Sequence, residues 1–193
     1  MPQPKNNLSQ RRTQKLLREA LIELIEEQSF DALTVQQITE RAMVSRATFY
    51  RNYQDKYALV EQIYMDATQV LFDTVIESGT AHPPQIWVKF FEHIAEYDRL
   101  YRALLGRKGS PWFVLKMRTS LVDLVERLTN GPNAVDPVIS PPFDGFVANL
   151  VATMLVEAIT WWLEQGKPYP PQEIAWRCAQ LAAAIFKESS AWP

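Results

Sequence analysis

Few side chains in this chain have the type and spacing that catalysis or metal binding requires. His82 and His93 are the two histidines, and their positions do not give the spacing of metal ligands. Cys178 is the single cysteine and lies in an apolar helical stretch, where an inert core thiol is expected. The basic segment 106–110 lacks the spacing of a phosphate-binding loop. The sequence therefore predicts no enzyme activity, no cofactor and no metal site.

A short polar stretch has the chemistry for binding nucleic acid. Phe49 and Tyr53 stand at an i, i+4 spacing and are expected to face inward, which leaves an outer face without acidic residues. Arginine can donate two hydrogen bonds to guanine in the major groove, and tyrosine, threonine and asparagine can reach phosphates or base edges. The outer face consists of Arg46, Ala47, Thr48, Tyr50, Arg51 and Asn52.

Three helices are predicted to position this face. Apolar residues at helical spacing predict an amphipathic helix over residues 9–28. Thr34 and Gln37 form a capping-box pattern that starts a second, short helix. Ser45 is a natural N-cap for a third helix over residues 46–51. Two short helices joined by a tight turn are typical of a helix-turn-helix.

The rest of the chain shows helical periodicity and no convincing strand, so we expect an all-α fold of about nine helices. A helix-turn-helix domain is expected over residues 1–55, and a second helical domain over residues 56–193. Between two of the later helices, residues 131–142 are predicted to form a proline-rich loop. The further helices are expected over residues 56–78, 84–97, 98–105, 111–130, 143–165 and 171–189.

Residues 9–65 resemble the DNA-binding domain of the TetR family of transcriptional regulators. The resemblance is carried by Phe30-x-x-x-Thr34-Val35, by Ile38, and by Val44-Ser45-Arg46-Ala47-Thr48-Phe49-Tyr50-Arg51-Asn52-Tyr53-x-Asp55-Lys56. It implies a TetR-like fold whose partner is double-stranded DNA.

The resemblance also assigns expected roles to single residues. Those at the edge of the groove would be Thr34 and Gln36, and Ser45 belongs to the same DNA-binding set. Those facing the bases would be Arg46, Ala47 and Thr48. Those holding the DNA backbone would be Tyr50, Asn52 and Lys56, while Arg51 fits either role.

Met43 departs from this resemblance, because the family usually has Gly, Asn or Asp at the end of the second helix. Methionine disfavours the left-handed backbone conformation that such a turn often adopts. Either the turn is made differently, or a modest strain is tolerated. The departure leaves open an alternative function, in which the chain is a helical dimer that binds a small molecule or a protein partner and does not read DNA.

Lys56 is a candidate for phosphate binding on a separate argument. A cation in the first turn of a helix opposes the positive end of the macrodipole and is mildly unfavourable there. A neighbouring phosphate would reverse that effect. The plain alternative is a solvated lysine.

The two helices nearest the C-terminus are apolar nearly all round and must be buried on two sides. Glu157 and other polar residues within them disfavour a membrane span, so no membrane partner is expected. In proteins similar to this one, the last two helices pair with their copies. The resemblance thus implies a homodimer whose two heads bind a palindromic operator.

Aromatic side chains are frequent between the fourth predicted helix and the two C-terminal ones. Each alone is expected in the core, but as a set they could line a pocket for a small apolar or aromatic effector. The candidate pocket residues are Trp87, Phe91, Tyr101, Trp112, Phe113 and Met117.

Composition is that of an ordinary soluble globular protein, with 47% hydrophobic and 22% charged residues and a net charge of −2. A single cysteine and no recognisable secretory signal indicate a cytoplasmic protein. We therefore expect a cytoplasmic transcriptional regulator, a repressor rather than an activator, with release from DNA by a small molecule as a further expectation.

Overall fold

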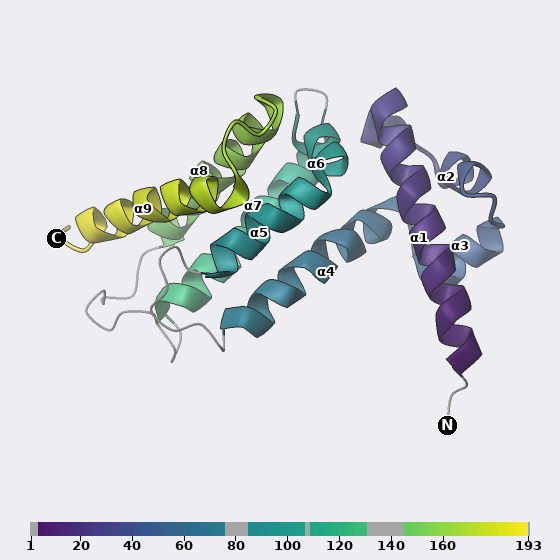
Figure 1. Ribbon diagram of the computed structural model, residues 1–193, viewed down its shortest axis with the longest axis horizontal. Coiled ribbons are helices and arrows are strands. Elements are labelled where there is room, and N and C mark those ends of the chain that lie inside the picture. The colour runs from purple at the N-terminus through teal and green to yellow at the C-terminus, as the bar shows by residue number, and fades with distance from the viewer. Residues whose placement is uncertain (1–3, 76–84, 107–108, 131–144, 193) are drawn as a thin grey trace. The chain divides into compact units, whose positions relative to one another are not determined.

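All regular structure in the described part of the chain is helical, which confirms the expected all-α fold of about nine helices (Figure 1). The chain divides into two compact units, residues 1–68 and residues 69–193, and α4 (Lys56–Val75) belongs to both. That the DNA-binding domain ends at residue 55 stays a prediction. The computed structural model describes residues 4–75, 85–106, 109–130 and 145–192.

The first unit contains α1 (Pro4–Glu27), a 3-10 turn η1 (Phe30–Ala32), α2 (Val35–Arg41), α3 (Arg46–Asn52) and the first turns of α4. α1 begins earlier than predicted because proline is favoured at the first helical position and no helix breaker follows it. The short turn η1 was not predicted. α2 and α3 lie within one or two residues of their expected limits.

A shared apolar core holds α1, α2 and α3 together. α2 and α3 are each too short to be stable alone, so their position depends on this core. Both pack against α1 and against each other. Buried side chains of this core include Leu17, Leu21, Phe30, Ile38, Phe49 and Leu59.

The second unit contains α5 (Gln85–Glu96), α6 (Asp98–Leu105), α7 (Pro111–Asn130), α8 (Gly145–Glu164) and α9 (Pro171–Ser189). The predicted limits of α6, α7 and α9 are confirmed, and α5 and α8 each end one residue before their predicted limit; the predicted first residues of α5 and α8 fall outside the described residues.

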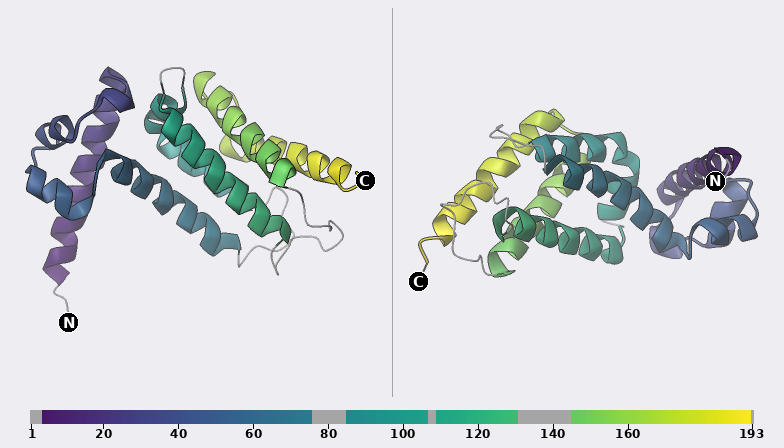
Figure 2. Two further views of the ribbon diagram at one scale, coloured as in Figure 1. Left: turned by 180° about the vertical axis from the view of Figure 1, so that it is seen from behind. Right: turned by 90° about the horizontal axis from the view of Figure 1, so that it is seen from below.

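Within this unit, α7 lies along α8 and α5 lies along α9, while α6 contacts both α7 and α8 (Figures 1 and 2). Two predictions, the loop over residues 131–142 and the end of α4 near residue 78, fall outside the described residues.

Two polar contacts fasten the turn between α8 and α9. The indole Nε1 of Trp162 donates to the carbonyl oxygen of Tyr169 at 2.8 Å, and its ring meets Phe91 edge-on at 5.5 Å between centroids. The ammonium of Lys167 donates to Asp98 Oδ2 at 2.9 Å, which joins this turn to the start of α6. The turn is therefore held by residues that lie far apart in the sequence.

By length and composition alone, α8 could cross a membrane. However, half of its apolar window is buried against the rest of the unit. That is also the environment of a core helix in a folded protein, and the absence of a membrane partner stays a prediction.

Candidate nucleic-acid interface

The start of α3 is set by the residue predicted to cap it. Ser45 has an extended backbone, and its Oγ accepts a hydrogen bond from the backbone N–H of Thr48 at 3.1 Å. This satisfies one of the N–H groups that have no partner within the helix. Phe49 is fully buried, and Tyr53 is buried as well, so the predicted inward pair is confirmed.

The remaining side chains of α3 form the outer face that the spacing predicted. Arg46, Ala47, Tyr50 and Arg51 are exposed, and the helix carries no acidic residue. Tyr50 stays 51% exposed although its ring touches Phe49, with 5.5 Å between the centroids. The face therefore offers cationic and aromatic groups to a partner.

Thr48 links several side chains of this face. Its hydroxyl lies 2.9 Å from Ser45 Oγ and accepts a hydrogen bond from Arg51 Nη2 at 2.9 Å. The Asn52 amide donates to the Thr48 carbonyl oxygen at 2.8 Å. These bonds hold Arg51 and Asn52 close to the helix, whereas Arg46 has no side-chain partner in the described part of the chain.

The N-terminal end of α2 shows the predicted capping box. Gln37 N–H donates to Thr34 Oγ1 at 3.2 Å, and Thr34 N–H donates to Gln37 Oε1 at 2.9 Å. Gln36 points elsewhere, because its amide donates to Glu40 Oε1 at 2.9 Å. Thr34 and Gln36 are both exposed.

Of the two alternatives that the sequence left open for this turn, the structure shows the strained one, with Met43 in a left-handed conformation. Its φ is +52°, in the left-handed region, and its side chain is 93% exposed. The turn closes because Val44 N–H donates to the Thr39 carbonyl oxygen at 3.0 Å. A left-handed residue other than glycine costs about 1–2 kcal/mol. Despite this cost, α3 begins where Ser45 predicts.

Lys56 has a role inside the first unit that the sequence did not suggest. Its ammonium donates to the carbonyl oxygens of Phe30, Asp31 and Leu33, each at 2.8 Å, and the residue is 9% exposed. It also lies over the Phe30 ring, 4.9 Å from the centroid. All three ammonium protons are therefore used inside the unit, so the solvated alternative is wrong, while phosphate binding by this group stays a prediction.

The physical reason is that η1 and the segment after it present carbonyl oxygens to the first turn of α4. Their negative ends offset the unfavourable position of a cation at a helix N-terminus, as a phosphate would have done. Burial lowers the pKa of Lys56, while the charges of Asp31 and Asp55 act in the opposite direction.

Arg41, in the first unit, has a structural role that the sequence did not predict. Its guanidinium donates to Glu23 Oε2 at 3.2 Å and to both carboxylate oxygens of Glu27, at 2.9 and 2.8 Å. The hydrogen bond from Arg41 lowers the pKa of Glu27. These hydrogen bonds join the end of α2 to α1. The three residues lie too far apart in the sequence for local spacing to predict the contact.

The candidate pocket residues of the second unit are mostly buried, and the structure brings only some of them together. Phe113 touches both Tyr101 and Trp112, with ring centroids 5.9 and 6.3 Å away. Phe91 instead contacts a tryptophan of α8. Trp87 and Met117 are buried on α5 and α7.

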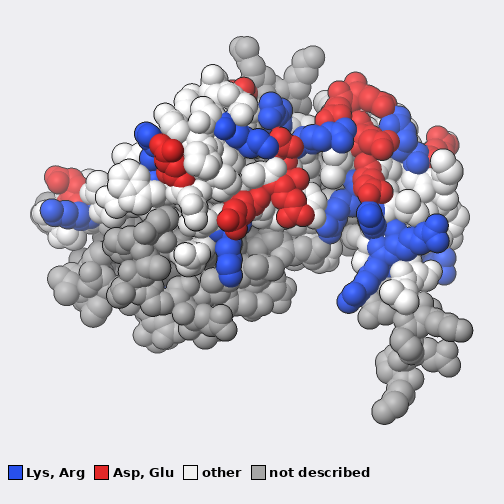
Figure 3. Space-filling view, viewed as in Figure 1, with Lys and Arg blue, Asp and Glu red and all other residues white. Residues whose placement is uncertain are grey.

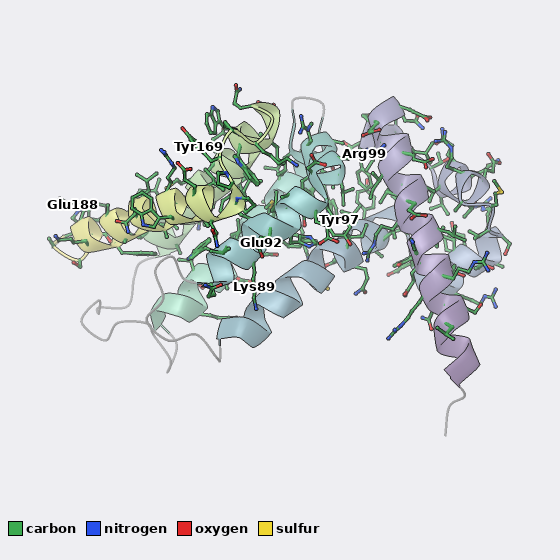
Figure 4. The ribbon with its side chains drawn as sticks, viewed as in Figure 1. Lys89, Glu92, Tyr97, Arg99, Tyr169 and Glu188 are labelled. Carbon is green, nitrogen blue, oxygen red and sulfur yellow. The ribbon has the colours of Figure 1, made fainter. Side chains whose placement is uncertain are left out.

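His93 is a polar residue beside this aromatic cluster that the sequence did not assign to it. Its Nε2 lies 2.9 Å from the hydroxyl of Tyr101, and its ring centroid is 4.7 Å from that of Tyr97. Figure 4 shows Tyr97 where α5 gives way to α6. Among the described residues, no group of three or more His, Cys, Asp or Glu is placed to hold a metal ion.

Cys178 is buried in α9, as predicted. Burial raises the pKa of its thiol to about 11. The reactive thiolate is therefore scarce at neutral pH.

A helix-turn-helix with a basic, acid-free outer helix, joined to a larger helical unit, defines a DNA-binding transcriptional regulator. Residues 17–63 match the family described as bacterial regulatory proteins, tetR family, and residues 81–183 match the one described as transcriptional regulator C-terminal region. The chain belongs to the TetR family.

Individual proteins match this chain less closely than the two family descriptions do. A stretch of 70 residues is 31% identical to the uncharacterized HTH-type transcriptional regulator YxbF of Bacillus subtilis (strain 168), covering 34% of this chain and 18% of that protein.

Two solved structures share the fold. A TetR transcriptional regulator from Streptococcus agalactiae 2603V has a TM-score of 0.60 at 20% identity, over 92% of this chain and 97% of its own. The dihydroxyacetone kinase operon activator DhaS has a TM-score of 0.61 at 14% identity, over 91% and 97%.

Proposed function

We propose that this protein is a cytoplasmic repressor that binds a palindromic operator as a homodimer and reads the bases with α3. The observation that carries the proposal is the outer face of α3, which is exposed, cationic and free of acidic residues. A helix of this kind fits the major groove of B-form DNA, where its first turns contact base edges. Repression follows when the bound dimer covers a promoter.

Within that proposal, Arg46 is the main base-reading residue, because its guanidinium has no side-chain partner in the described part of the chain. Ala47 lies beside it and can contact a thymine methyl group. Thr48 also faces the bases, and Arg51, which it holds, contacts either a base or a phosphate. Tyr50 is exposed at a position suited to the DNA backbone.

The other residues predicted to contact DNA already use part of their hydrogen-bonding capacity within the protein. Thr34 and Ser45 already bond to backbone N–H groups, so they offer their remaining hydroxyl capacity at the groove edge. Gln36 is placed beside Thr34, and Asn52 is partly engaged by the helix backbone. We omit the side chain of Lys56 from this set.

The exposed apolar faces of α8 and α9 support the proposed homodimer. Both helices are partly buried within the chain and leave large apolar side chains between 43% and 58% exposed. Such a concentration is unusual on the surface of a monomer and typical of a protein interface. The exposed side chains are Phe146, Leu150 and Trp161 on α8, and Trp176 and Leu181 on α9.

We further propose a small apolar or aromatic effector that binds among the buried aromatic residues of the second unit. Support comes from the contacts of Phe113 with Tyr101 and Trp112, and from the polar pair that Tyr101 makes with His93. These side chains pack against one another, so an effector has to separate them. A coupling of about 1–3 kcal/mol between the two sites would be typical.

Selection of bound fragments from random duplex DNA tests the proposal. Enrichment of a palindrome with half-sites about one helical turn or more apart is the expected result. No enrichment at low salt would favour the alternative, a dimer that binds a small molecule or protein partner and does not read DNA. Sedimentation equilibrium of the wild type and of Leu150→Glu tests the dimer separately, and an unchanged monomer in both would refute it.

A further inference from the structure

The charges along α1 are separated into two halves. Residues 1–18 carry five basic side chains and no acidic one, whereas the C-terminal half of α1 carries Glu19, Glu23, Glu26 and Glu27. This order is the reverse of the one that favours a helix, because cations lie toward the positive end of the macrodipole and anions toward the negative end. Figure 3 shows blue over the N-terminal part of this helix and red over the other part.

The acidic half has cationic partners inside the unit. Arg41 of α2 lies 3.2 Å from Glu23 and 2.8 Å from Glu27. The unfavourable anions at the C-terminal end of α1 are therefore offset by a residue that the fold brings to them.

Within the basic half, Arg11 and Arg12 are not offset in this way. Arg11 and Arg12 are exposed, and neither has an acidic partner among the described residues. Lys15 is 3.8 Å from Glu19, but its side chain is 76% exposed, so this pair is weak. Three cations within about two turns thus face solvent.

This basic surface lies next to the reading helix. α3 packs against α1, and α1 continues past α3 at its N-terminal end, on the side away from α2 (Figures 1 and 2). A DNA duplex held by the outer face of α3 would therefore bring its phosphates toward the first turns of α1.

We infer that Arg11, Arg12 and Lys15 form a second DNA-binding surface that holds phosphates outside the base pairs read by α3. The inference rests on the proposed function. A row of exposed cations, of which only Lys15 has a weak acidic partner, matches a row of phosphates in charge and needs no particular base sequence. Each head thus contacts a longer stretch of duplex than its reading helix covers.

The test compares the full-length wild type with Arg11→Ala/Arg12→Ala and with the matched control Arg11→Lys/Arg12→Lys, which keeps the charge. Affinity is measured over a range of salt concentrations on the selected palindrome, once trimmed to its half-sites and once with flanking base pairs. Circular dichroism confirms that each variant is folded.

If the surface binds phosphates, the alanine variant loses on the order of 10- to 100-fold in affinity on the flanked duplex. Four phosphate contacts are lost in a dimer, so the slope of log affinity against log salt falls by roughly 3 to 4. Flanking base pairs strengthen binding by the wild type and the lysine variant, but not by the alanine variant.

An alanine variant with the slope and affinity of the wild type would overturn the inference, and so would equal losses in the alanine and lysine variants. These outcomes leave the proposed function intact as long as the wild type enriches a palindrome. If it enriches none, the proposed function fails, and the same salt titration on a random duplex decides the inference by itself.

Discussion

Replacing Lys56 by methionine separates the internal role that the structure gives this residue from the DNA-binding role that its position in sequence suggested. Methionine keeps most of the side-chain length and its packing against Phe30, and it removes the ammonium. The substitution takes three hydrogen bonds from the carbonyl oxygens of Phe30, Asp31 and Leu33. We expect the first unit to lose stability and the salt dependence of DNA binding to stay the same.

The magnitude follows from the three contacts. A hydrogen bond to a charged group contributes about 1.5–3 kcal/mol, and a buried carbonyl left without a partner costs about 1–3 kcal/mol. The Phe30 carbonyl keeps a second partner, since it also accepts from the Leu33 N–H at 3.1 Å. Water can reach part of the site as well, so the loss falls below the sum of three bonds. We expect Lys56→Met to destabilise the unit by about 2–4 kcal/mol.

Hydrogen exchange of the α2 and α3 amides measures this loss of stability within the intact chain. The salt dependence of DNA binding is then measured under conditions in which the wild type and Lys56→Met are both folded. Lys15→Met is the matched control, because Lys15 is highly exposed on the basic surface of α1. The control should leave amide protection unchanged and reduce the salt slope, which is the opposite pair of effects.

The opposite pattern at Lys56 would refute this reasoning. If Lys56→Met leaves the protection of α2 and α3 intact and flattens the salt dependence, then the ammonium reaches a phosphate in the complex. The three carbonyl contacts would then be a minor feature of the free protein.

Three further outcomes are expected. Arg46→Ala should weaken DNA binding by about 1–3 kcal/mol and relax the base preference at one position of each half-site. Binding to single-base variants of the operator measures this, and equal losses on all sequences would contradict a base contact. Met43→Gly should raise the unfolding free energy of the head by about 1 kcal/mol in urea titrations, because glycine adopts a φ of +52° without strain; lower stability would rule that strain out. For Asp98, burial raises the pKa, but the hydrogen bond and charge of Lys167 outweigh it and leave the pKa below its ordinary value. Asp98→Asn should thus cost about 1 kcal/mol at neutral pH, and the difference from the wild type should vanish as the pH falls through the lowered pKa; a difference that grows on acidification would show the opposite sign.

Local features of the fold could be predicted because their causes lie within a few residues. The Thr34–Gln37 capping box and the Ser45 cap depend on contacts three residues apart, and both are confirmed. Similarly, the inward position of Phe49 and Tyr53 follows from helical periodicity alone. The outer face of α3 is what remains once that pair is buried, so the candidate site was predictable to the same extent.

The role of Lys56 was not predictable in this way. Its three acceptors lie 23 to 26 residues earlier in the chain, in a 3-10 turn that no local pattern indicated and in the residue that follows it. The local sequence does not distinguish between phosphate, solvent and carbonyl oxygens as partners of a lysine in the first turn of a helix. Only the packing of η1 against α4 selects among them.

The sequence by itself thus determined the helices, their caps and the basic, acid-free character of the α3 surface, because these depend on neighbouring residues and on periodicity. Tertiary structure decided which charges are used internally, as with Lys56, Arg41 and Asp98, and which are left for a partner, as with Arg11 and Arg12. The reason is physical: a charged side chain acts on whatever group packing brings within hydrogen-bonding distance, and that group can lie anywhere along the chain.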